Sequence, residues 1–327
     1  MKRRRLKKRW MFPVVLLVWM TIHSSSVTAY VEAVKEGEAR PVFSEEDPLK
    51  ERIEQGSKVR DKKPIDARMD RVWKAIPGYN GLVVDREETY RLARKNGSEK
   101  PIHWVYSEVP PKVKLEDLGL SPIYRGNPEK PMASLMINVA WGTEYLPQML
   151  AILDREKVSA TFFLDGSWLA KHQDIARGLI KKGHEVGNHA YTHPMMSSLS
   201  RERIRGEISR TEKLIRQLGI RSSFFAPPAG DFNQATLEEA NRLGMKTVLW
   251  TVDTVDWRES STPEWMVSRV RQGVDNGILI LMHPTGRTVQ ALPQIIRTIE
   301  NEGIKLGTVS ELLSSKRVDH VEPGSSF

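Results

Sequence analysis

The chain has 327 residues, enough for one large domain and a smaller one, and 39% of its residues are hydrophobic. Its formal net charge is +9, but seven of the first nine residues are basic, and removing them leaves only +2, which does not support a basic surface for nucleic acid. The chain contains no cysteine, so disulfides and thiol chemistry are excluded.

Residues 1–29 are predicted to form an export signal. The basic start precedes an apolar run from Trp10 to Ile22 and a small-residue stretch ending in Val27-Thr28-Ala29, the pattern of a cleavage site. Because the apolar run is shorter than the roughly 20 residues that span a bilayer, a cleaved signal is favoured, and an uncleaved anchor stays as the alternative. Both interpretations predict an extracytoplasmic protein, either secreted or membrane-anchored.

Two further segments precede the large domain. Residues 30–63 are charged and show no apolar periodicity, which indicates a solvated linker or a loosely helical spacer. Residues 64–118 are patterned as a small α/β module without an acid–base cluster or a set of metal ligands, so we expect this module to hold or present its neighbour. Its predicted elements are a helix within Asp66–Ile76, a strand at Leu82–Val84, a helix from Asp85 to Asn96-Gly97 and a strand at Ile102–Tyr106.

In residues 131–315, short apolar runs alternate with helical patterns. Strands are predicted at Leu135–Val139, Ala160–Leu164, Glu185–Gly187, Ser223–Phe225, Lys246–Thr251, Ile278–Met282 and Ile304–Leu306. Helices are predicted at Leu146–Glu156, Trp168–Lys182, Arg201–Leu218, Gln234–Leu243, Glu264–Val274 and Val289–Glu302. The alternation predicts an α/β fold with a parallel sheet, closed into a barrel or wound open. Residues 316–327 are predicted as a disordered tail.

Reactive residues follow four of these strands. His189 and His193 follow the third strand, and their spacing suits two imidazole ligands of one divalent metal, or else two polar loop residues bonded to backbone. Further along the chain come Pro227-Pro228-Ala229-Gly230 after the fourth strand, Asp253 and Asp256-Trp257 after the fifth, and His283 after the sixth. Active sites of such folds lie at the carboxyl ends of the strands, so the sequence predicts a site, or the relic of one, at that rim.

Five segments of the large domain carry a family resemblance. They are Ala160–Leu164, Gly187–Pro194, Phe225–Gly230, Trp250–Trp257 and Leu279–His283. In this order they resemble the NodB-homology domain of the polysaccharide deacetylases, carbohydrate esterase family 4, and the chain is similar to the YlxY-type, sporulation-associated subgroup. The resemblance implies a distorted (β/α)7 barrel of NodB type with a small N-terminal α/β module. It also implies metal-dependent removal of acetyl groups from peptidoglycan or a chitin-like oligosaccharide.

The resemblance assigns a metal and an acid to residues that match the family's motifs. His189 and His193 match the two metal-binding histidines, and zinc is the expected metal if the protein is active. His283 matches the general acid that protonates the leaving amine, and Asp256 matches the carboxylate that orients this histidine. The alternative for His283 is a buried histidine bonded to backbone, with Asp256 as a structural partner only.

Four other residues are expected to contact the glycan. Trp257 matches a residue that lines the glycan groove. The backbone amide of Ala229, in the motif that includes Pro228, matches the amide that holds the oxyanion. Trp141 is predicted to fill the core of the barrel or to stack against a sugar ring.

Several positions depart from the family's pattern. The family's first motif ends in two aspartates, a general base and a metal ligand, and these positions, aligned through Gly142, are Ala140 and Trp141. The arginine that supports the base is Ala226, and the hydroxyl residue after the first histidine is Ala190. Loss of a general base costs about 10²–10⁴-fold in rate, and two histidines fall short of the three protein ligands of a catalytic zinc. The family's standard mechanism therefore cannot run with these residues.

Three polar residues are weighed as replacements for the lost carboxylates. Asn138 lies on the same strand face as Ala140, but an amide is neither a base nor a strong metal ligand. Asp165 ends the second strand and Asp231 follows Gly230, so either side chain could reach the rim. The alternative for each aspartate is an ordinary helix cap or turn residue.

Two functions stay open, and a third, a lipid- or membrane-acting protein, rests only on the N-terminal apolar run. The chain is either an exported deacetylase with a rearranged metal site, or a catalytically inactive pseudoenzyme, with no cofactor, that binds glycan or a wall- or spore-assembly partner. Both predict cell-wall glycan as the partner and the cell wall or spore envelope as the location. Neither predicts nucleic-acid binding, and a membrane is contacted only through an uncleaved N-terminal segment. Metal content separates the two, because tightly held stoichiometric metal favours the enzyme.

Overall fold

The computed structural model of the chain describes residues 47–97 and 99–318, together with residues 24, 28 and 32. Most of the predicted export signal and residues 319–327 of the predicted tail lie outside the described residues. Within this described part, none of the helices combines the length and the hydrophobicity that a membrane crossing requires. The chain divides into two compact units, Met1–Gln55 and Gly56–Phe327, with the boundary inside helix α3 (Pro48–Arg60).

Two small antiparallel strand pairs open the second unit. The strands are β1 (Arg68–Asp70) with β2 (Lys74–Ile76), and β3 (Gly81–Val84) with β4 (Tyr106–Val109), and helix α4 (Arg86–Asn96) follows β3. The helix predicted within Asp66–Ile76 was wrong, because this segment is a hairpin. The Asp70 carboxylate accepts hydrogen bonds of 2.8 Å from the amides of Val72 and Trp73, and these bonds close the turn. Asp85 caps α4 as predicted.

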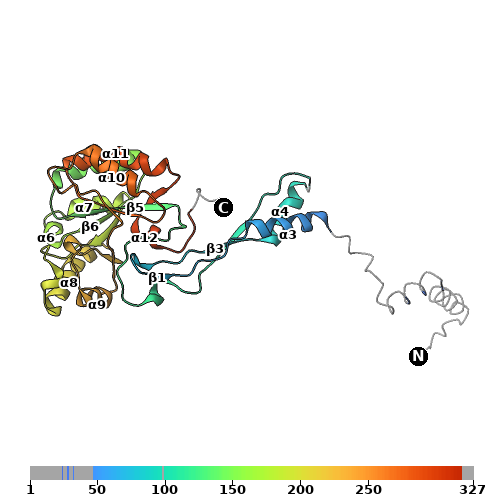
Figure 1. The fold of residues 1–327 in the computed structure, drawn as a ribbon, viewed down its shortest axis with the longest axis horizontal. Helices are drawn as coiled ribbons and strands as arrows, with labels where there is room; N and C mark the ends of the chain where they lie inside the picture. The colour runs from blue at the N-terminus through green and yellow to red at the C-terminus, as the bar shows by residue number, and fades with distance from the viewer. Residues whose placement is uncertain (1–23, 25–27, 29–31, 33–46, 98, 319–327) are drawn as a thin grey trace, which may run out of the picture. The chain divides into compact units, whose positions relative to one another are not determined.

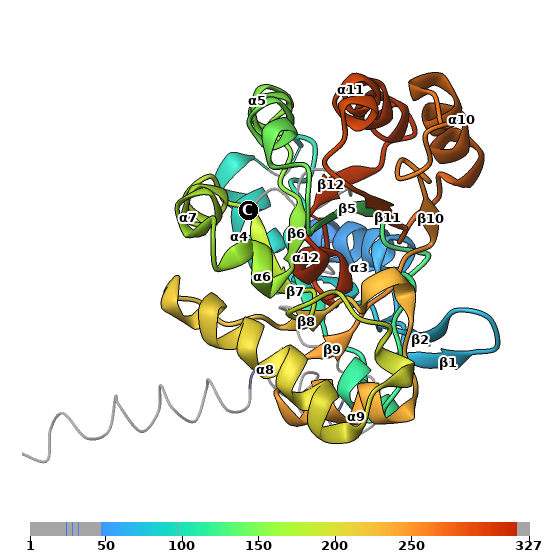
Figure 2. The same cartoon turned by 90° about the vertical axis from the view of Figure 1, so that its left-hand side faces the viewer.

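A curled parallel sheet forms the large domain and confirms the predicted distorted (β/α)7 barrel. Its strands are β5 (Met132–Val139), β6 (Thr161–Leu164), β7 (Glu185–Asn188), β8 (Phe224–Phe225), β9 (Lys246–Thr247), β10 (Val252–Asp253), β11 (Leu279–Met282) and β12 (Lys305–Gly307). Seven strands follow one path in the order β10-β11-β5-β6-β7-β8-β9, and β12 pairs with β5 beside that path. Figure 1 shows the course of the chain, and Figure 2 shows the helices arranged around the curled sheet.

Most helices of the large domain lie close to the predicted positions, whereas no helix was predicted at Val309–Leu313. The helices are α5 (Leu146–Glu156), α6 (Gly166–Leu169), α7 (Gln173–Lys181), α8 (Arg201–Gln217), α9 (Gln234–Arg242), α10 (Pro263–Gly273), α11 (Gly286–Glu300) and α12 (Val309–Leu313), with 3-10 turns at Leu115–Leu118, Thr143–Tyr145, Met196–Ser198 and Pro228–Gly230. The single helix predicted at Trp168–Lys182 is divided into α6 and α7. In Figure 2, α5, α10 and α11 lie along the top of the sheet, and α8 and α9 lie along the bottom.

The strand predicted at Lys246–Thr251 closes the barrel, because its two ends pair with opposite edges of the sheet. Its start, β9, pairs with β8, whereas the residues that follow it form β10, which pairs with β11. Between them, the amide of Thr251 donates a 2.8 Å hydrogen bond to the carbonyl oxygen of Leu279. Since β9 and β10 are the two ends of the sheet path, residues 248–251 connect its edges.

The central strand β5 is buried along its whole length and serves two cores. Its residues Ala133, Leu135, Ile137 and Val139 pack against the surrounding helices, and Met132 and Met136 pack inside the barrel with Val309, Leu312 and Leu313 of α12. The amide of Val309 donates to the hydroxyl of Thr161, the first residue of β6, so α12 fills the amino end of the barrel. Asn138 lies two residues after Met136 in β5, so its side chain points to the same face of the strand, into the barrel interior near the carboxyl end.

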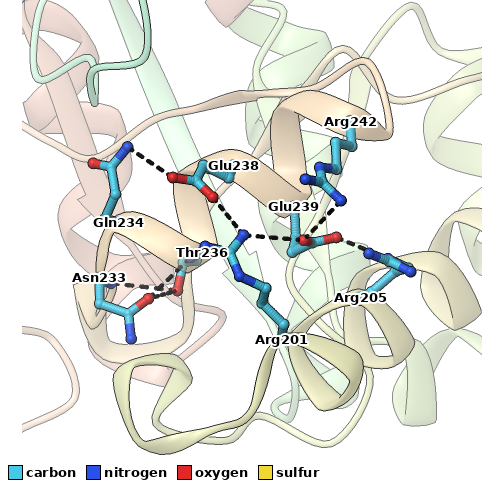
Figure 3. A network of polar contacts seen from close by, with 8 residues as sticks. All are labelled: Arg201, Arg205, Asn233, Gln234, Thr236, Glu238, Glu239 and Arg242. Carbon is cyan, nitrogen blue, oxygen red and sulfur yellow. Dashed lines mark hydrogen bonds and ion pairs between the residues drawn. The ribbon is translucent and has the colours of Figure 1, made fainter.

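An ionic network joins α8 to α9, the helices that follow the loops after β7 and β8 (Figure 3). The fully buried carboxylate of Glu239 lies 2.8 Å from Nε of Arg205, 3.4 Å from Arg201 and 3.6 Å from Arg242. The hydrogen bond from Arg205 holds the pKa of Glu239 below its usual range, so the carboxylate stays ionised. The network therefore fixes the two helices next to the candidate site.

Candidate functional site

The residues predicted to act together lie at one rim of the barrel. We call Trp141, His189, His193, Ala229 and His283 the barrel mouth. Trp141 follows β5, the two mouth histidines follow β7, Ala229 follows β8 and His283 follows β11. Neighbouring parallel strands are about 4.8 Å apart and all eight strands run the same way. The carboxyl ends of these strands therefore bring the five residues to the same rim.

The imidazole of His283 is held by the buried carboxylate of Asp256. Oδ2 of Asp256 accepts hydrogen bonds of 2.6 Å from the backbone amide of His283 and from the hydroxyl of Thr288. Oδ1 lies 2.8 Å from Nδ1 of His283. This geometry is that of a carboxylate that orients a histidine, while the general-acid role of His283 stays a prediction.

Two residues that sequence reasoning missed support Asp256. Thr288 binds its carboxylate, and Arg287 donates to its backbone carbonyl oxygen over 3.2 Å. The spacing of Thr285 and Thr288 signals a helix start, and Thr285 does cap α11. That signal predicts the cap but not the contact with Asp256, which lies on another loop.

The two mouth histidines are brought together by a tightly curled loop. Ala190 and His193 have left-handed backbone angles, with φ of 60° and 56°, and the two imidazole centroids are 5.1 Å apart. His189 is 1% exposed, and its Nδ1 lies 2.7 Å from the carbonyl oxygen of Ala226, so Nδ1 donates and Nε2 carries the lone pair. Burial, reinforced by the neighbouring His193, lowers the pKa of His189 to about 3. Burial also lowers the pKa of His193.

The depressed pKa of His189 predicts a loss of stability in acid. Between pH 6.5 and pH 3 the unfolded chain binds a proton at this position that the folded protein does not, so the free energy of unfolding falls as pH falls. From pH 6 to pH 4 the contribution of His189 is about 2 kcal/mol. Urea unfolding should show that His189→Gln, which keeps a donor for Ala226, loses less stability over this range than the wild type by about this amount. Equal losses in the two proteins would contradict the buried neutral imidazole.

The indole of Trp141 covers the imidazole of His283. The two rings are nearly parallel, with an interplanar angle of 6° and centroids 5.7 Å apart. Trp141 is 46% exposed, whereas the His283 side chain is 16% exposed. An aromatic ring therefore occupies the solvent side of the histidine that the family resemblance assigns as the acid.

Gly142 permits this stacking, because it lets the loop after β5 approach the loop after β11. Its φ is +75°, and a Cβ added there would lie 1.9 Å from the carbonyl oxygen of Pro284, the residue after His283. We expect Gly142→Ala to lower the free energy of unfolding by about 3 kcal/mol, from backbone strain together with overpacking.

The matched control for this substitution is Gly303→Ala. Gly303 has a similar φ of +72°, but a Cβ there would meet nothing within 4 Å, so only the backbone strain of about 1–2 kcal/mol is expected. Urea unfolding of both variants measures the difference. Equal losses would show that the close approach at Pro284 does not constrain the loop.

The three polar residues weighed as replacements differ in their contacts. Asp165 caps α6 by accepting from Trp168 and Ser167 through Oδ1, while its Oδ2 is buried without a hydrogen-bond partner, and burial raises the pKa of Asp165. Oδ1 of Asn138 is also buried without a partner. Asp231 accepts from both the amide and the hydroxyl of Ser197, at 2.7 and 2.8 Å, so it ties two loops together.

The side chains of the mouth do not fit a catalytic zinc. Such a zinc takes three protein ligands, and among the described residues no three His, Cys, Asp or Glu side chains are grouped so that they could hold a metal ion. The mouth brings together the imidazoles of His189 and His193, while the end of β5 supplies only a methyl group at Ala140 and an indole at Trp141. The mouth therefore offers only two of the three ligands that such a zinc takes.

The remaining predicted glycan contacts also lie at the rim. Ala229 is central in the turn Pro228–Gly230 and has a left-handed backbone, with φ of 54°. Trp257 follows Asp256 directly and is 49% exposed, with the guanidinium of Arg258 over its ring at 4.8 Å. The structure thus places Trp257 and Trp141 as exposed aromatic rings after β10 and β5, which flank β11 in the sheet.

The sequence matches the model of one protein family and many curated proteins. The model of the polysaccharide deacetylase family matches residues 125–248. The uncharacterized protein YlxY of Bacillus subtilis (strain 168) is 44% identical over 290 residues, which cover 88% of this chain and 90% of that protein. A peptidoglycan-N-acetylglucosamine deacetylase of Bacillus cereus is 33% identical over 178 residues, which cover 53% of this chain and 83% of that protein.

Comparison with solved structures finds a protein of the same architecture. A pseudoenzyme of the CE4 family from Bacillus anthracis has 42% sequence identity and a TM-score of 0.77, and the match covers 83% of this chain and 96% of that chain. A mutant of that pseudoenzyme, described as having restored enzymatic activity, has 41% identity and the same TM-score, covering 83% and 99% of the two chains. The similarity extends beyond the barrel domain in both.

Proposed function

Because this chain belongs to the polysaccharide deacetylase family, carbohydrate esterase family 4, we propose that it binds N-acetylated cell-wall glycan at the barrel mouth without hydrolysing it. Proteins of this family are generally metal-dependent. The relatives named as peptidoglycan deacetylases supply the substrate class, an N-acetylated wall polymer. The chain is thus proposed to bind the same class of glycan as these relatives without catalysing its deacetylation.

One observation carries this proposal. The end of β5, where the family resemblance expects a general base and a metal ligand, presents Ala140 and the indole of Trp141. Neither side chain can accept a proton from water or bind a metal, and the described residues supply no third ligand. The indole also covers His283. The groups that remain suit binding, because an exposed indole stacks against the apolar face of a sugar ring.

The similar structure from Bacillus anthracis supports the same conclusion. It is called a pseudoenzyme, and a mutant of it has restored enzymatic activity. An inactive member of the family therefore exists at 42% identity to this chain. We infer that this chain, too, has kept the barrel and lost the reaction through its site residues.

The place of action follows from the ligand. Peptidoglycan lies outside the cytoplasm, and the basic and apolar N-terminus has the composition of an export signal. We therefore propose that the protein acts in the cell wall or the spore envelope, whether the signal is cleaved or kept as an anchor.

Metal content and glycan binding, measured on the same purified protein, test the proposal. After treatment with a chelator and addition of zinc, the protein should retain far less than one zinc per chain. It should bind N-acetylglucosamine oligosaccharides without releasing acetate, and Trp141→Ala should weaken this binding about tenfold. Leu120→Ala, at an exposed apolar residue preceding β5 in the chain, is the control and should leave the affinity unchanged.

One tightly held metal per chain, with acetate release that disappears in His283→Ala, would show an active deacetylase with a rearranged metal site. Absence of binding to both oligosaccharides and intact peptidoglycan would reject the glycan as the ligand.

A further inference from the structure

The exposed large apolar side chains of the barrel domain are confined to one rim. In residues 131–315, all of which the structure describes, these side chains are Trp141, Met195, Trp257 and Trp265. The first three lie in loops at the carboxyl ends of β5, β7 and β10. Trp265 lies in the first turn of α10, and this helix starts at the same rim because it follows the loop after β10. Large apolar side chains exposed at one rim alone indicate a binding surface rather than random scatter.

The side chain of Arg269 holds the ring of Trp265 in place by covering one of its faces. The guanidinium of Arg269, one helical turn later, lies over the Trp265 ring at 5.0 Å from its centroid. Nε of Arg269 donates a 2.8 Å hydrogen bond to the carbonyl oxygen of Asp253, the last residue of β10. Arg269 thus links the ring to the end of a barrel strand, and Trp265 remains 41% exposed.

The three rim tryptophans share one arrangement, in which a neighbouring side chain covers one face of each indole. His283 covers Trp141, Arg258 covers Trp257 and Arg269 covers Trp265. For Trp257 and Trp265 the neighbour is a guanidinium, and a cation over one face of an indole is itself favourable. In all three cases the neighbouring side chain fixes the ring before a ligand arrives. A fixed ring loses little conformational entropy on binding, which favours affinity.

The spacing of the rings suits a chain molecule. Trp141 and Trp257 follow strands on the two sides of β11, and the ends of these two strands are about 10 Å apart. Trp265 lies in the helix that follows β10, in the layer outside the sheet, so the elements that carry the three rings extend outward from the mouth over roughly 20 Å. A protein partner would be expected to meet one contiguous apolar patch, whereas separate flat rings among polar residues match the alternating apolar faces and hydroxyls of a polysaccharide.

We propose that Trp265 is a distal sugar-binding platform, through which the protein binds a glycan strand of several sugars rather than a single end. This inference rests on the proposed function, because it extends the same glycan outward from the barrel mouth. Trp141 and Trp257 bind the sugars at the mouth, and Trp265 binds a sugar further along the strand. The affinity therefore depends on chain length.

Titration calorimetry of the full-length protein with β-1,4-linked N-acetylglucosamine oligomers of two, four and six sugars tests this inference. In the wild type the hexamer should bind at least about tenfold more tightly than the dimer. Trp265→Ala should weaken hexamer binding about tenfold and leave dimer binding within about twofold of the wild type. Trp265→Tyr, which keeps an aromatic ring, should retain most of the hexamer affinity. Leu120→Ala should change neither, and thermal unfolding checks that each variant is folded.

The binding results distinguish a failure of the distal platform from a failure of glycan binding as a whole. If the protein binds all three oligomers equally, or if Trp265→Ala binds the hexamer as well as the wild type does, the distal platform is rejected while glycan binding at the mouth stands. If neither the oligomers nor intact peptidoglycan bind, the proposed function is rejected and the distal platform is rejected with it.

Discussion

The double variant Ala140→Asp/Trp141→Asp is expected to hold about one zinc per chain and to release acetate from N-acetylated oligosaccharides at least about 10²-fold faster than the wild type. One new carboxylate would join His189 and His193 as the third ligand, and the other would serve as a base at the end of β5. Removing the indole also uncovers His283. Zinc titration calorimetry and an acetate assay with N-acetylglucosamine oligosaccharides measure the two gains.

The matched control is Ala140→Asn/Trp141→Asn. It introduces side chains of the same shape but without charge, so neither zinc binding nor acetate release should appear. In the aspartate variant, a further His189→Ala substitution should abolish both gains. If the aspartate variant remains metal-free in excess zinc, the end of β5 is not the position where the carboxylates are missing.

Asp256→Ala is expected to lower the free energy of unfolding by about 3–5 kcal/mol, because it breaks a buried charged contact. The side chain of Asp256 is fully buried, and its loss leaves the amide of His283 without its acceptor and removes the 2.6 Å acceptor of the Thr288 hydroxyl. Each buried donor left unpaired costs about 1–3 kcal/mol. Urea unfolding measures the loss, and a weaker near-ultraviolet circular dichroism signal should report the loosened stack of Trp141 on His283.

Asp253→Ala is the control for this substitution. Asp253 ends β10 on the same loop, but it is only half-buried and accepts one short hydrogen bond, of 2.7 Å from the amide of Val255. A loss of about 1 kcal/mol is expected. If Asp256→Ala destabilises the protein no more than Asp253→Ala does, the buried carboxylate is not what holds the His283 loop.

Much of the fold could be predicted from the sequence where local pattern and burial agree. The helix over Leu146–Glu156 has the predicted bounds, because its apolar residues recur at helical spacing and pack on one face. The helix predicted within Asp66–Ile76 failed, because the turn formed by Asp70 outweighs three apolar residues at helical spacing. The strand at Lys246–Thr251 was predicted, but its division between two sheet edges depends on pairing with β8 and β11, which local pattern does not contain.

The location of the candidate site was predictable, and its internal contacts were not. The sequence places His189, Asp256 and His283 after parallel strands, and the fold brings such positions to one rim. The stack of Trp141 on His283 depends on the close approach of Gly142 to Pro284, which are far apart in the sequence. Likewise, nothing in the sequence around Arg269 indicates that it would reach the end of β10.

The position of β5 in the middle of the sheet determines how the barrel can form during synthesis. As the chain leaves the ribosome, β5 first meets β6, while β11 and β12 follow only after residue 279 has been made. Until then β5 keeps an open apolar edge, and open edges of this kind recruit other chains into aggregates. Pairing between such distant segments is also slow. This edge of β5 is therefore expected to stay open until β11 has been made.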